Sequence, residues 1–134
     1  MKVGIFIFPC YIEFSYQYQN QVEQLEKFVL DFQKEKDKQE PEMMEDKKWL
    51  GYFNQSSLEE FFYWGDWAEN SNQWDFESWL DAIYNGEYQL QGCMIISDTT
   101  ARLKYAAWAW PYGGADCLRH LVQLFGLTII KEEV

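Results

Sequence analysis

The chain contains few of the residues that most often carry chemistry. Histidine occurs once, at position 120, and the three cysteines (Cys10, Cys93 and Cys117) show no Cys-x-x-Cys spacing. An odd, scattered set of cysteines predicts neither a disulfide framework nor a zinc site. The first apolar run ends at Pro9, too early for a signal peptide core, and no run approaches the roughly 18 residues of a membrane span. We expect no metal, no cofactor, no membrane segment, and a reducing cytoplasm.

Basic residues are absent between Lys48 and Arg102. The net charge is −11, and the segment from Glu40 to Tyr88 holds twelve acidic residues against two lysines, whereas the rest of the chain is nearly neutral. Such local self-repulsion opposes compactness, and solubility alone does not require it. Two interpretations follow: a solvated acidic face, or a surface that meets a basic partner.

Nucleic-acid binding is disfavoured by the same charge balance. Trp108 and Trp110 alternate with alanines on one expected strand, with Arg102 and Lys104 on their face, which is typical of strands that stack bases. A strongly acidic protein nevertheless repels phosphates, and the aromatic motif of RNA-recognition modules is missing. We expect no direct contact with nucleic acid.

The hydrophobic pattern predicts one α+β domain over residues 1–134, because 48% hydrophobic residues are enough for a core. The chain order is predicted to be β-α-β-β-α-β. This order is typical of the ferredoxin-like split βαβ fold, with a four-stranded antiparallel sheet and two helices on one face. The expected strands are Lys2–Phe8, 87–97, 101–110 and 127–131, and the expected helices are Asn20–Lys38 and 115–125.

An acidic, aromatic helical insertion is predicted at residues 40–86. Its first helix is expected to start at Leu58, with Ser57 and Glu60 forming a capping box. Its second helix is expected from Phe76 to Tyr84, with Asp75 as the N-cap. The charged stretch 34–48, broken at Pro41, is interpreted as a linker.

The stretch from Phe61 to Asp81 combines eight aromatic and five acidic residues. Helical spacing places Trp79 in the core and turns Tyr63 and Trp67 away from it. Exposed Trp and Tyr often anchor interfaces, and surrounding carboxylates steer a basic partner. The candidate partner-binding residues are Glu59, Glu60, Tyr63, Asp66, Trp67, Glu69, Asp75, Glu77 and Asp81.

Catalytic candidates are few. Cys117 and His120 share a helix, but the helical wheel turns them partly apart and puts His120 on the polar side, so we expect a packing cysteine and a solvated histidine. The "PYGG" sequence at 111–114 lacks a phosphate-loop spacing and is interpreted as a turn. The carboxylates do not form a calcium-loop motif. No catalytic residue is predicted.

A short, acidic, aromatic-rich chain with the segment "AWAWPYGG…LRHLVQLFG" resembles the immunity proteins that bacteria make against toxins of contact-dependent and related polymorphic systems. The resemblance implies a non-enzymatic inhibitor that neutralises a cognate, basic toxin, often a nuclease, by direct binding. Two alternatives are an acidic nucleic-acid mimic that blocks a DNA-binding protein and a subunit of a larger complex. The interleaving of aromatic and acidic residues favours a specific protein interface over a mimic.

Overall fold

The computed structural model describes residues 8–38, 46–62, 74–86, 88–107 and 116–133. These residues form an α+β fold built on one four-stranded antiparallel sheet. The elements in chain order are β1 (Phe8–Ser15), α1 (Gln19–Lys36), α2 (Asp46–Leu50), α3 (Gln55–Phe61), α4 (Phe76–Asn85), β2 (Tyr88–Ile95), β3 (Thr100–Ala107), α5 (Asp116–Leu124) and β4 (Thr128–Glu133).

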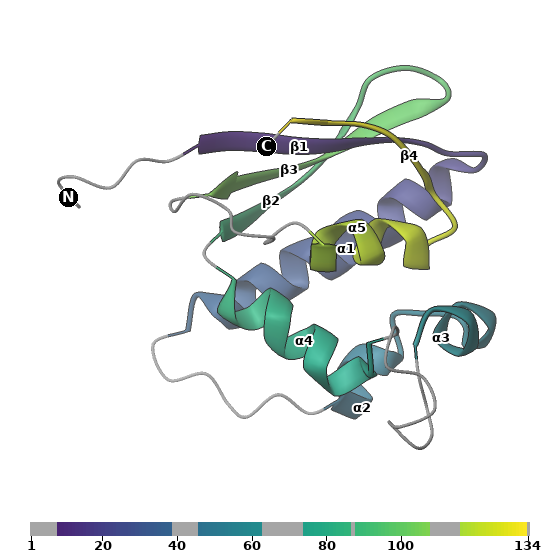
Figure 1. The fold of residues 1–134 in the computed structure, drawn as a ribbon. Coiled ribbons are helices and arrows are strands. Elements are labelled where there is room, and N and C mark those ends of the chain that lie inside the picture. Colours follow the sequence, from purple (N-terminus) through teal and green to yellow (C-terminus); the bar gives the residue numbers. More distant parts are fainter. Residues whose placement is uncertain (1–7, 39–45, 63–73, 87, 108–115, 134) are drawn as a thin grey trace, which may run out of the picture.

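The strands lie in the order β2-β3-β1-β4, and every neighbouring pair is antiparallel. Alternation along β1 buries Ile12 and Phe14 on one face, while Tyr11 and Glu13 lie on the other. All the helices lie on the buried face of the sheet (Figure 1). The predicted α+β class and four-stranded antiparallel sheet are thus confirmed.

The first strand runs through Pro9 instead of ending before it. The expected strand Lys2–Phe8 lies outside the described residues except for Phe8, and β1 continues to Ser15. Pro9 pairs with β3, whereas pairing with β4 begins only at Tyr11. Among the described residues, Pro9 therefore has a partner strand on one side only, which is the edge-like setting where proline is tolerated.

The helix α1 packs along the edge strand β2 as well as under the sheet. Gln33 Oε1 accepts a hydrogen bond from Leu90 N at 2.8 Å, and Glu26 Oε2 accepts one from Cys93 N at 2.9 Å. Between these two residues β2 bulges at Gly92, whose φ of 112° suits glycine. Side chains of α1 therefore satisfy backbone donors that an edge strand would otherwise expose.

The fold has three layers in Figure 1: the sheet, then α1 and α5, then α2, α3 and α4. The third layer packs on the second, because α3 and α4 contact α5 and the rings of α2 and α4 meet Phe28 of α1. Five rings lie within about 6 Å of the Phe28 ring. They belong to Phe32, Trp49, Tyr52, Phe53 and Trp79. One continuous core thus joins the helices of the expected insertion to the rest of the described chain.

Two local predictions about this third layer need correction. The α3 helix is capped by Asn54 and not by Ser57, because Asn54 Oδ1 accepts a 2.8 Å hydrogen bond from Ser57 N. An Asn side chain caps at least as well as Ser, so the helix starts three residues earlier than expected. The expected linker at 34–48 overlaps two helices, since α1 continues to Lys36 and α2 begins at Asp46, and Trp49 of α2 lies in the core. The predicted cap of α4, Asp75, is confirmed.

Candidate functional site

The outer layer carries four exposed carboxylates that belong to the predicted set. We call them the acidic helical surface; they are Glu59 and Glu60 on α3, and Glu77 and Asp81 on α4. Glu77 and Asp81 are four residues apart, so both project from the same side of α4. Neither α3 nor α4 contains a lysine or arginine. The two helices therefore present negative charge without intervening positive charge.

Asp75 differs from these four because its side chain caps the N-terminus of α4. It is partly buried, and its carboxylate accepts a hydrogen bond from Ser78 N at 3.1 Å. Hydrogen bonding from Ser78 lowers the pKa of Asp75. The remaining predicted partner-binding residues, Tyr63, Asp66, Trp67 and Glu69, lie outside the described residues.

Five other carboxylates of the described chain take part in ion pairs. Arg102 Nε lies 2.7 Å from Glu13, and Lys38 Nζ lies 2.9 Å from Glu35. Further ion pairs are Lys27–Asp31, Arg119–Glu132 and Arg119–Asp116. Among the ion pairs of the described residues, none involves Glu59, Glu77 or Asp81. The acidic helical surface thus differs from these paired carboxylates, and no basic residue lies on its two helices.

The aromatic residues beneath this surface belong largely to the core. Trp79 is 0% exposed, as predicted, and its Nε1 donates a 3.0 Å hydrogen bond to Cys117 O. Phe62 is also buried, and Phe61 packs against the core while partly exposed. The rings hold α3 and α4 on α5, so the carboxylates project from a rigid support.

His120 lies in an aromatic cluster, which corrects the expectation that it is solvated. Its ring centroid is 4.9 Å from that of Phe62, 5.6 Å from Trp74, 5.8 Å from Phe61 and 6.1 Å from Trp79. The helical wheel failed here because α5 is covered on two sides, by the sheet and by the outer helices α3 and α4. His120 Nε2 is buried, with no hydrogen-bond partner within the described part of the chain.

A pH dependence follows from this position. Burial lowers the pKa of His120 below its usual value of 6.5. As the pH falls past 6.5, the unfolded chain binds a proton before the folded one, so stability is lost toward acidic pH. We expect wild-type protein to lose stability relative to His120→Phe between pH 7 and pH 5, in denaturant melts.

Carboxylates titrate in both proteins, so the difference between wild type and His120→Phe isolates the imidazole. Because the chain has one histidine, a single NMR imidazole signal also reports the pKa directly. A folded-state pKa at or above 6.5 would contradict the buried placement.

Cys117 is a packing residue, as predicted. It is buried, and its Sγ lies 2.8 Å from Tyr88 Oη. Burial raises the pKa of the thiol, which opposes thiolate formation. The structure thus brings Cys117 together with Tyr88, and it places the His120 ring among aromatic side chains.

The ammonium of Lys36 occupies the junction between α4 and β2. Its Nζ donates hydrogen bonds to the carbonyl oxygens of Ile83, Gly86 and Tyr88, at 2.9, 3.2 and 3.0 Å. The same atom lies 4.4 Å from the centroid of the Tyr88 ring. Sequence reasoning missed this contact, since a lysine near the end of an amphipathic helix is usually solvated.

The other chemical interpretations find little support among the described residues. No group of three or more His, Cys, Asp and Glu side chains in that part of the chain could hold a metal ion. No helix there is long and apolar enough to cross a bilayer. On the open sheet face, Arg102 is held by Glu13 and by the Tyr11 ring at 4.0 Å. Trp108 and Trp110 lie outside the described residues.

Comparisons with protein-family models, with curated proteins and with solved structures found no match. The proposals below therefore rest on the geometry and charge of the described residues.

Proposed function

We propose that this protein is a non-enzymatic inhibitor of the immunity type, which neutralises a basic protein toxin by binding it through the acidic helical surface. The observation that carries the proposal is that Glu59 on α3 and Glu77 and Asp81 on α4 are exposed and take part in no ion pair of the described residues. Exposed charges of one sign on a rigid support accelerate association with a partner of opposite charge and disfavour other partners.

The absence of catalysis is part of this proposal. A nucleophilic cysteine needs a base within hydrogen-bond reach and a lowered pKa. Here burial raises the pKa of Cys117, and its described side-chain neighbour is the Tyr88 hydroxyl. No disulfide joins Cys10, Cys93 and Cys117, which supports a reducing cytoplasm as the place of action.

We also propose that the scaffold is the ferredoxin-like split βαβ arrangement. Two features support it: β3 lies between β1 and β2, and β1 lies between β3 and β4. In this interpretation α1 and α5 are the two crossover helices, and residues 40–86 form the insertion that supplies the acidic helical surface. The fold by itself does not indicate a function.

Charge reversal on α4 tests the proposed function. The probe is a basic toxin domain recovered from native-cell lysate on the immobilised wild-type chain and then held on a biosensor surface. We expect Glu77→Lys with Asp81→Lys to weaken binding by about 10–100-fold, mainly through slower association, because like charges then face each other. Wild-type association should also slow between low and physiological salt, where the Debye length is about 8–10 Å.

The matched control is Asp98→Lys with Glu133→Lys, which changes the net charge equally but on the sheet side of the molecule. Both control residues are exposed and belong to no described ion pair. Equal loss of binding in both double variants would show that net charge alone matters. Unchanged binding in the α4 variant would reject the acidic helical surface as the interface.

A further inference from the structure

A cavity of about 440 Å³ lies where α1, the segment between α2 and α3, and the end of α5 meet; we call it the α5-end cavity. No charged residue of the described chain lines it. Its polar lining includes the amide of Gln24 and the hydroxyl-bearing Ser57. Tyr52, Phe53 and Phe125 also line it, and the rings of the two phenylalanines lie 5.2 Å apart. The α5-end cavity thus combines neutral polar groups with aromatic residues.

The end of α5 makes this cavity attractive to a cation. Leu124, the last residue of α5, lines it together with Phe125 and Gly126. Gly126 has a φ of 76°, the left-handed conformation that commonly closes a helix, and its N–H donates to Gln123 O. A helix C-terminus carries about half a negative charge on its last carbonyl groups. Gln21 Nε2 donates to Phe125 O at 3.1 Å, which leaves that oxygen a second lone pair.

The other helix ends at the cavity do not oppose a cation. Gly51, which directly follows the last residue of α2, is part of the lining. The start of α3 lies there too, but Asn54 Oδ1 caps it by accepting a 2.8 Å hydrogen bond from Ser57 N. Two helix C-termini and one capped N-terminus therefore meet at the cavity, so the negative ends outnumber the positive one.

The end of α4 shows how this chain binds an ammonium group at a helix C-terminus. Lys36 Nζ donates hydrogen bonds to Ile83 O and Gly86 O where α4 ends, and it lies 4.4 Å from the centroid of the Tyr88 ring. Carbonyl groups at a helix end and one aromatic ring hold the lysine there. The α5-end cavity offers the same two components, and no basic residue of the described chain lines it.

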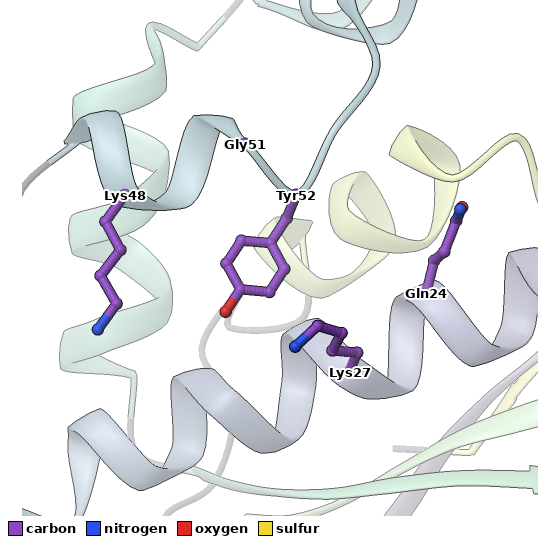
Figure 2. A pocket seen from close by; sticks show the side chains of 5 residues that line it. All are labelled: Gln24, Lys27, Lys48, Gly51 and Tyr52. Atoms are coloured by element: carbon purple, nitrogen blue, oxygen red, sulfur yellow. The ribbon is translucent and has the colours of Figure 1, made fainter.

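Lys27 does not fill the α5-end cavity, although it lies near Tyr52. Its Nζ is 3.2 Å from Asp31, and this carboxylate also accepts a 2.6 Å hydrogen bond from Tyr52 Oη. Lys27 and Asp31 therefore compensate each other. Figure 2 shows the Lys27 ammonium beside the Tyr52 hydroxyl, whereas the Gln24 amide points away from both. Within the described residues no hydrogen bond engages the Gln24 amide, so its oxygen is available to a donor from outside.

We propose that the α5-end cavity binds a lysine side chain of the basic partner protein. The ammonium meets the carbonyl groups at the end of α5, Gln24 Oε1 and the Ser57 hydroxyl, while the methylene groups pack against Phe53. This inference rests on the proposed function, because α3 begins at this cavity and also carries Glu59 and Glu60 of the acidic helical surface. A partner drawn to that surface presents its basic side chains beside the cavity.

A minimal lysine probe tests the site without the toxin. The probe is Nα-acetyl-lysine methylamide, and the control is Nα-acetyl-norleucine methylamide, which has the same stem without the ammonium. Each is titrated into ¹⁵N-labelled full-length chain at physiological salt and followed by NMR. We expect the lysine probe to shift the amide signals of Gly51 and Gly126 with a Kd of about 10–50 mM. The norleucine probe should bind at least about threefold more weakly.

Opposite charges at one position of the cavity give the sharpest contrast. Gln24→Lys puts an ammonium of this chain at the site and should abolish the shifts. Gln24→Glu should tighten binding of the lysine probe about two- to fivefold, the range for one exposed ion pair. The matched controls are Gln89→Lys and Gln89→Glu, which change the net charge equally at an exposed β2 position outside the cavity lining. Both controls should leave the shifts at Gly51 and Gly126 unchanged.

Gly51→Leu tests the volume of the cavity. A Cβ added there has Lys48 O as its nearest neighbour, at 3.9 Å, so the fold accepts a side chain. This variant should lose the probe shifts and bind the toxin domain about tenfold more weakly, mainly through faster dissociation. Ser56→Leu, at an exposed α3 position outside the cavity lining, should do neither.

Two results would overturn the lysine site: no saturable shift at Gly51 up to about 100 mM probe, or equal effects of the Gln24 and Gln89 variants. Unchanged binding of the toxin domain by Gly51→Leu would overturn the assignment of the site to the partner. The proposed function would stand in each case, since the α4 charge reversal tests it separately and alters no residue of the α5-end cavity.

Discussion

Replacing Trp79 by Ala is expected to lower the free energy of unfolding by about 3–5 kcal/mol, the range for large-to-small changes in a packed core. The indole is fully buried and packs against several aromatic rings, among them those of Phe28, Phe53 and Phe62. Its Nε1–H also satisfies Cys117 O in the first turn of α5. Denaturant melts monitored by far-UV circular dichroism would measure the loss.

Trp79→Phe separates the two contributions of the indole. The phenyl ring keeps most apolar contact but lacks the donor to Cys117 O, so this variant should lose about 1–2 kcal/mol. Trp79→Ala should also loosen the packing of α4 on α5. The imidazole of His120 would then be more exposed, and its pKa would rise toward 6.5. A loss below about 1 kcal/mol for Trp79→Ala would mean that Trp79 is not a core residue.

Replacing Lys36 by Met is expected to cost about 2–4 kcal/mol, because three partly buried carbonyl oxygens lose a charged donor together. Met keeps the length and apolar character of the stem, so the loss reports the ammonium itself. Lys34→Met is the matched control on the same helix: Lys34 is exposed, and its replacement should change stability by less than about 0.5 kcal/mol. Equal effects at the two positions would contradict the hydrogen bonds of Lys36.

The difference in stability between wild type and Lys36→Met should also depend on pH. Burial lowers the pKa of Lys36 from 10.5 to about 8. Between these values the unfolded chain holds the proton more tightly than the folded one, so stability rises with pH. The stability of wild type relative to Lys36→Met should therefore increase from pH 8 to pH 10.5 and stay constant below pH 8. Buried tyrosines and cysteines are common to both proteins and largely cancel. A constant or shrinking difference would contradict the lowered pKa.

Local sequence signals predicted the elements that local physics determines. Val22, Leu25, Val29 and Phe32 recur at helical spacing, and all four are buried in α1. Asp75 precedes an apolar helical pattern and caps α4, as expected. The turn at 98–100 was also predicted, since two strand-like runs flank it.

Contacts between helices that are distant in the sequence determine the features that local sequence patterns did not predict. His120 has polar neighbours along α5, but the outer helices α3 and α4 cover that side of α5. No local sequence pattern indicates that these helices lie there. Trp49 lies in a highly charged stretch, where a short helix gains its stability from contacts with Phe28 and Phe32. The cavities beside Gly51 escaped prediction for the same reason. Their walls come from α1, the α2–α3 turn and the end of α5, which the sequence does not place together.

An inhibitor that acts one-to-one must accumulate at least to the level of its toxin, and crowding favours self-association. An exposed sheet edge is a template on which further chains add strands and grow fibrils. Here Gln33 and Glu26 already occupy the outward-facing amides of Leu90 and Cys93. A strand arriving from another chain would have to displace both side chains before it could pair at these positions. At these two positions the edge of β2 is thus covered by side chains of its own chain, which disfavours edge-to-edge growth.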